Sequence, residues 1–137
     1  MARLIALDMP ASQTFVDLVR RTWSNGDAVL PIDQRLPLAS KRMLLDTMAP
    51  SEVIDASFTA SSLPNGRPMQ DGDALVIASS GSTGSPKGII HTHSSLLAGA
   101  QASASRLQLT SDDHWLVCIP VYCDVALVDS VKVVQLN

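Results

Sequence analysis

The sequence ALVIASS, residues 74–80, places the tightest constraint on the fold because five apolar residues follow one another without alternation. A strand with one face in water alternates apolar and polar residues, whereas a strand covered on both faces does not. The run therefore predicts a buried strand. Segments with helical periodicity stand before and after it in the chain, so we expect helices to pack against a sheet.

Helical spacing of apolar residues predicts three helices, the first beginning near Ser12 and ending at Asn25-Gly26. The second covers residues 40–48 and stops before Pro50, and the third begins at Ser94. Short apolar runs alternate with these helices, which predicts an α/β fold, a layered sheet with flanking helices. The expected strands are DAVLPI (27–32), EVIDA (52–56), ALVIASS (74–80) and HWLVCIP (114–120), with KGIIHTH (87–93) extended and residues 57–72 a loop.

Composition narrows the class of protein. The chain has 137 residues, of which 46% are hydrophobic and 17% charged, which favours one packed domain. A net charge of −3 predicts no nucleic-acid partner. The first ten residues make a poor signal peptide, and no run is long enough for a transmembrane segment. Cys118 and Cys123 fit neither a disulfide framework nor a zinc site, which favours a cytoplasmic location.

The segment SSGSTGSPKG, residues 79–88, cannot fill an apolar core. Its glycines allow backbone amides to face a ligand, its hydroxyls add donors, and Lys87 adds a positive charge, so the segment suits the oxygens of a polyphosphate. The Walker pattern fails because Pro86 precedes the lysine and Gly88 follows it, and the GxGxxG spacing is absent. A surface loop without a ligand is the simpler alternative, and we expect the loop to be exposed in either case.

The same residues resemble the phosphate-binding signature of the adenylate-forming (AMP-binding) superfamily, which includes acyl-CoA ligases. That signature is a Ser/Thr/Gly-rich loop, then a small residue with Pro-Lys-Gly, a short apolar stretch and Thr-His, here ending at Thr92-His93. The segment before the loop, residues 26–55, and the helix and HWLVCIP after it are also similar to the family. The resemblance implies part of the N-terminal domain of an adenylate-forming enzyme, closest to compact CoA ligases of the O-succinylbenzoate or fatty-acid type.

In such enzymes a carboxylic acid attacks the α-phosphate of ATP, pyrophosphate leaves with the help of Mg²⁺, and the acyl group passes to coenzyme A. The resemblance implies that hydroxyl groups and glycine backbone of the loop contact the phosphates together with Lys87. The residues implied in cofactor binding are Ser79, Ser80, Gly81, Ser82, Thr83, Gly84, Lys87 and Gly88.

The histidines after the loop offer a weaker signal. His91 and His93 would share one face of a strand, but His114 is the only further histidine, so a metal site is not predicted. We expect Thr92 or Ser94 to cap the following helix.

The family pattern is lost after about residue 122, where Cys123 stands in place of an expected histidine. No base that could activate Cys123 is identifiable, so no catalytic residue is predicted. The chain is therefore expected to be a truncated ligase-like protein spanning residues 1–137, inactive alone. The alternative is a non-enzymatic phosphate-binding or protein-interaction module that self-associates through an uncovered surface.

Overall fold

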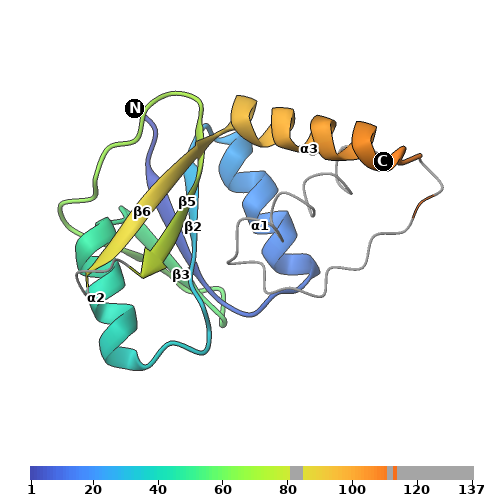
Figure 1. Ribbon diagram of the computed structural model, residues 1–137. Helices are drawn as coiled ribbons and strands as arrows, with labels where there is room; N and C mark the ends of the chain where they lie inside the picture. Colours follow the sequence, from blue (N-terminus) through green and yellow to red (C-terminus); the bar gives the residue numbers. More distant parts are fainter. Residues whose placement is uncertain (81–84, 111–112, 114–137) are drawn as a thin grey trace.

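The computed structural model describes residues 1–80, 85–110 and 113 of the chain (Figure 1). Helices and strands alternate up to residue 55, as the apolar pattern predicted, and three further strands then follow one another before the last helix of this part. In order the elements are β1 (Leu4–Asp8), α1 (Gln13–Ser24), β2 (Ala28–Pro31), α2 (Leu38–Met48), β3 (Glu52–Asp55), β4 (Ala60–Ser62), β5 (Asp73–Ser80), β6 (Pro86–Thr92) and α3 (His93–Leu107).

The strands form a mixed sheet in the order β4-β3-β1-β2-β5-β6. The four inner strands are parallel, and β4 and β6 run antiparallel to their neighbours at the two edges. An α/β fold with a layered sheet and flanking helices is thus confirmed. The predicted strand over residues 114–120 lies outside the described residues.

Two strands were not predicted from the sequence. Residues 4–8, considered only as a poor signal peptide, form β1, which lies between β2 and β3 in the middle of the sheet. Part of the predicted loop over residues 57–72 forms β4, whose three residues are all exposed. Strand β4 exists because the chain turns back after Asp55 and pairs Glu52 with Ser62.

Helices cover both faces of the sheet, α1 and α3 on one side and α2 on the other (Figure 1). Alternate residues of β5 supply the two cores: Leu75 and Ile77 pack on the side of α1, and Val76 packs on the side of α2. The prediction that ALVIASS is covered on both faces is therefore confirmed.

The helix boundaries follow the sequence signals closely. Ser12 caps α1, its side-chain oxygen accepting a hydrogen bond of 3.1 Å from the amide of Phe15. Helix α1 ends at Ser24 with Asn25 as its C-cap, and Gly26 follows with φ of +77°, a conformation that glycine adopts without strain. At its last turn the indole nitrogen of Trp23 donates a hydrogen bond to the carbonyl of Ala74 at the start of β5.

Candidate functional site: the hairpin that carries the phosphate loop

Strands β5 and β6 form a hairpin that holds the two ends of the glycine-rich loop. Ser79 pairs with Lys87 and Ser80 with Pro86, and the Ser79 hydroxyl donates a hydrogen bond of 3.3 Å to the Lys87 carbonyl. Four of the predicted site residues, Gly81, Ser82, Thr83 and Gly84, lie outside the described residues, and Ser80, Lys87 and Gly88 join Ser79 in the strands.

The expectation that residues 79–88 are exposed holds for Ser85, Lys87 and Gly88. It is wrong for Ser79 and Pro86, which are half-buried because the hairpin ladder extends to both of them. The strands therefore fix the backbone on each side of the loop, and Ser79 and Lys87 face one another across the ladder.

The hairpin opens at the edge of the sheet where the parallel strands end. Strand β5 is parallel to β2, which is parallel to β1, so Ser80 lies at the same edge as Asp8. Open α/β sheets bind ligands outside the carboxyl ends of their strands. The loop between Ser80 and Ser85 thus begins at the edge where such folds place ligands.

Two lysines near this edge differ in whether their ammonium groups form ion pairs. The ammonium of Lys41 lies 2.6 Å from Oδ1 of Asp8, an oxygen that also accepts a 2.7 Å hydrogen bond from the amide of Gln34. The exposed ammonium of Lys87 has no ion pair within residues 1–80, 85–110 and 113. Within the described part of the chain, Lys87 thus differs from Lys41, which is paired with Asp8.

The packing around Gly88 favours glycine at this position, in addition to its predicted role in ligand binding. A Cβ added at Gly88 would lie 2.8 Å from the sulfur of Met48 and 3.1 Å from Cγ1 of Val76. A side chain at residue 88 would force the buried Met48 side chain to shift. This contact joins residues 40 positions apart, so the sequence pattern could not reveal it.

A small cavity of about 220 Å³ lies between α2 and the hairpin. It was not predicted, because it depends on how α2 packs against β5 and β6. Its apolar residues come mainly from α2 and the preceding loop, and Ser79 contributes a hydroxyl at the hairpin side. The lining residues are Leu36, Ser40, Met43, Leu44, Ala78, Ser79 and Pro86.

Thr92 caps α3, as predicted. Its Oγ1 accepts a hydrogen bond of 3.1 Å from the amide of Ser95, while the Ser95 hydroxyl lies 3.0 Å from the amide of Thr92. The ring of His93 meets the indole of Trp23 edge-on with centroids 5.2 Å apart. His93 is thus part of the packing between α1 and α3.

Metal ligands and reactive cysteines were also considered from the sequence. Within the residues that the structure describes, no three His, Cys, Asp or Glu side chains are close enough to hold a metal ion. Cys118, Cys123 and His114 lie outside the described residues, so the interpretation of Cys123 stays a prediction. Over the same described residues no helix has both the length and the apolar character to cross a bilayer.

Comparison with known protein families shows which family the chain is related to. Residues 7–134 match the family described as AMP-binding enzyme. The chain belongs to this family. Membership confirms the resemblance that the loop and its flanking residues indicated. The family match extends to residue 134. It therefore gives no sign of the loss of the family pattern that the sequence predicted after about residue 122, and that loss stays a prediction.

Relatives of this AMP-binding chain include acyl-CoA ligases. It is 32% identical over 104 residues to the medium-chain fatty-acid–CoA ligase of Escherichia coli, covering 69% of this chain and 18% of the relative. It is 36% identical over 77 residues to the malonate–CoA ligase of Arabidopsis thaliana, covering 56% of this chain and 12% of the relative. The chain therefore spans less than a fifth of the length of either relative.

Solved structures show the same fold. ATP-bound MatB from Rhodopseudomonas palustris superimposes with a TM-score of 0.78 at 17% identity, covering 99% of this chain and 34% of that one. The fold of this AMP-binding chain is thus that of a part of an adenylate-forming enzyme.

Proposed function

We propose that residues 79–88 bind the phosphates of ATP in an ATP-dependent carboxylate–CoA ligase. The observation that carries the proposal is the pairing of Ser79 with Lys87 at the carboxyl edge of the sheet. It sets a hydroxyl on one side of the loop and, on the other, an ammonium that has no ion pair among the described residues. Family membership and the activities of the two CoA ligase relatives support the same reaction class.

Each part of the loop would have a distinct role. Ser80, Ser82 and Thr83 would donate hydroxyl hydrogen bonds to phosphate oxygens, and Ser79 would do so after its hydroxyl leaves the Lys87 carbonyl. Gly81, Gly84 and Gly88 would let the backbone approach the phosphates. Lys87 would neutralise charge on the leaving pyrophosphate. Mg²⁺ would arrive bound to the phosphates, since this ion commonly takes substrate phosphates as ligands and keeps several waters. Coenzyme A would be the acyl acceptor.

We propose further that the 137-residue chain does not form acyl-adenylate by itself. Adenylation requires the carboxylate to be held against the α-phosphate, and such positioning supplies effective molarities of roughly 10⁵ M or more. The chain corresponds to less than a fifth of the CoA ligase relatives named above. We expect the chain to bind phosphate weakly and to form no acyl-adenylate. A cytoplasmic location is also part of the proposal.

Calorimetric titration with ATP and Mg²⁺ tests the phosphate site. We expect saturable binding that Lys87→Ala abolishes and that Arg106→Ala, the matched removal of one positive charge in the last turn of α3, leaves intact. Equal binding by the wild type and Lys87→Ala would contradict the assignment. Pyrophosphate exchange with a panel of fatty and aromatic acids tests the second proposal, and exchange that Lys87→Ala abolishes would contradict inactivity.

A second candidate function is protein interaction. Strand β6 is an edge of the described sheet, and Ile89 and Ile90 are 49% and 52% exposed on it. Exposed apolar edge strands invite pairing with another chain. If the chain self-associates through this edge, Ile90→Lys will lower its sedimentation coefficient at high protein concentration, and an unchanged value would argue against this edge.

A further inference from the structure

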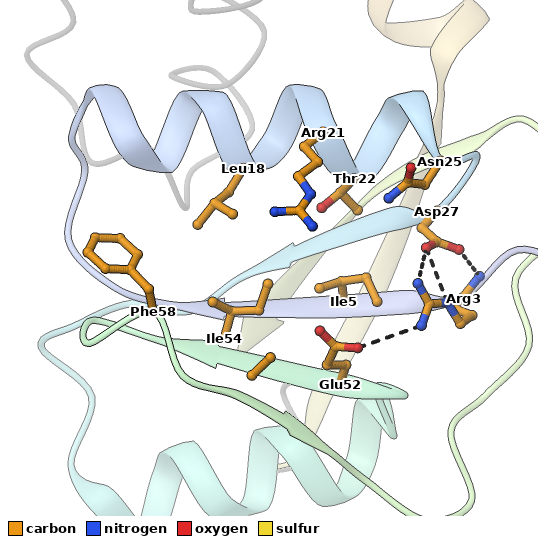
Figure 2. Close-up of a pocket in the computed structure, with 11 residues that line it drawn as sticks. Arg3, Ile5, Leu18, Arg21, Thr22, Asn25, Asp27, Glu52, Ile54 and Phe58 are labelled. Atoms are coloured by element: carbon orange, nitrogen blue, oxygen red, sulfur yellow. Dashed lines mark hydrogen bonds and ion pairs between the residues drawn. The ribbon is translucent and has the colours of Figure 1, made fainter.

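A second cavity, of about 340 Å³, lies beneath α1 on the side of β1 and β3 (Figure 2). It shares no lining residue with the phosphate hairpin or with the cavity beside α2. One end is apolar, with Leu18, Ile54 and Phe58, and the other end is charged, with Arg3, Asp27 and Glu52 (Figure 2). Its volume falls within the range of pockets that bind small organic molecules.

The charged end carries more negative than positive charge. The guanidinium of Arg3 lies 2.7 Å from Oδ2 of Asp27 and 3.6 Å from Oε2 of Glu52, so one cation faces two carboxylates. The hydrogen bond with Asp27 is the main reason that the pKa of Arg3 is raised. This end therefore offers no positive charge to a ligand.

Arg21 differs from Arg3 in having no such partner. Its guanidinium points from the last turn of α1 into the cavity, between the apolar end and the charged end (Figure 2). Among the described residues it makes no ion pair or side-chain hydrogen bond, whereas the neighbouring Arg20 lies 3.8 Å from Asp17. The cavity thus contains, beside an apolar wall, one cation whose guanidinium has no direct partner among the described residues.

Phe58 is held at the mouth of the cavity at some conformational cost. Its φ of +62° lies in the left-handed region, which is unfavourable for a bulky side chain, and 60% of the residue is exposed. Oδ1 of Asp55 fixes the turn by accepting hydrogen bonds from the amides of Ser57 and Thr59, at 2.9 and 3.0 Å. Strained residues of this kind concentrate at ligand-binding sites.

We propose that this cavity binds a small aromatic carboxylate. The carboxylate would accept hydrogen bonds from the Arg21 guanidinium, whose planar fork matches two oxygens. The aromatic ring would pack against Leu18, Ile54 and the exposed ring of Phe58, because aromatic pairs gain more than their buried area alone provides. The site is independent of the proposed phosphate loop.

Fluorine NMR of 4-fluorobenzoate with the complete chain tests the proposal. We expect saturable line broadening, affinity about tenfold or more weaker in Arg21→Gln, and unchanged affinity in Arg20→Gln, which removes the same charge one residue away. Phe58→Asn, which tolerates the left-handed backbone but lacks the ring, is expected to weaken binding while leaving the circular dichroism spectrum unchanged. The neutral analogue 4-fluorobenzyl alcohol is expected to bind more weakly than the acid.

Four results would overturn the proposal: broadening that does not saturate, equal affinity in the wild type and Arg21→Gln, equal affinity for the acid and the alcohol, or displacement of the probe by ATP. ATP with Mg²⁺ is added last. If the fluorobenzoate line stays broadened after ATP is added, the two ligands bind at separate sites. If ATP removes the broadening, the probe was bound at the phosphate loop instead. Failure of ATP to bind would affect only the proposed phosphate site.

Discussion

The indole nitrogen of Trp23 donates a 2.7 Å hydrogen bond to the carbonyl oxygen of Ala74, fastening the end of α1 to the start of β5. At this point the register of β5 against β6 shifts between Asp73 and Leu75, and Ala74 and Leu75 both join the core on the side of α1. Trp23 therefore secures an irregular point in the strand that leads to the phosphate loop.

Trp23→Phe is expected to lower the free energy of unfolding by about 1–2 kcal/mol, because it leaves the buried Ala74 carbonyl without its indole donor. Trp23→Ala should cost more, since it also removes the ring that packs on His93. Urea denaturation followed by circular dichroism measures both variants. Equal midpoints for the Phe variant and the wild type would show that this hydrogen bond contributes nothing.

Gly88→Ala is expected to destabilise the fold by about 1–3 kcal/mol, because the new methyl group would meet the Met48 sulfur. In a Met48→Ala background the same change should cost less, since the obstructing side chain is gone. The coupling in this double-mutant cycle is measured by denaturation of all four proteins. Strictly additive effects would contradict the close approach of α2 to β6.

Thr92→Ala is expected to cost about 1 kcal/mol by removing the oxygen that caps the amide of Ser95. Thr92→Ser keeps a hydroxyl and should retain most of the stability. Amide hydrogen exchange at Ser95 offers a local readout and should become faster in the alanine variant. Equal exchange in both variants would exclude a capping role.

The Asp55 turn is expected to loosen in acid. Hydrogen bonds from Ser57 and Thr59 hold the pKa of Asp55 below its ordinary value. A lowered pKa stabilises the turn above the unfolded-state pKa of about 3.9, and this stabilisation is lost as pH falls through the lower folded value. The Thr59 amide proton shift should therefore titrate below about pH 4. In Asp55→Asn the Thr59 amide proton shift should not change with pH over the same range. If the variant shows the same titration as the wild type, Asp55 is excluded as its cause.

Local signals predicted the helices well because their causes are local. Ser12 and Thr92 cap their own helices, and Asn25-Gly26 ends α1, so each boundary depends on neighbouring residues. The loop residues carried the family signal for the same reason: their order along the chain is itself the motif.

The sequence did not reveal features that depend on partners distant in the chain. Strand β1 is short and was considered only as a leader segment, since nothing nearby shows that β2 and β3 enclose it. The cavity around Arg21 is formed by residues from Arg3 to Ala60. No spacing rule links these residues, because the packing of α1 over the sheet brings them together.

The central position of β1 has a consequence for synthesis on the ribosome. Leu4 pairs with Ala28 and Ile5 with Glu52, so β1 waits for two partners that are translated 24 and 47 residues later. Its apolar residues stay without a sheet during that interval, in a state open to chaperones or to misassociation. Slower translation between Asp8 and Glu52 would lengthen this interval, so codon choice in that stretch should influence the soluble yield.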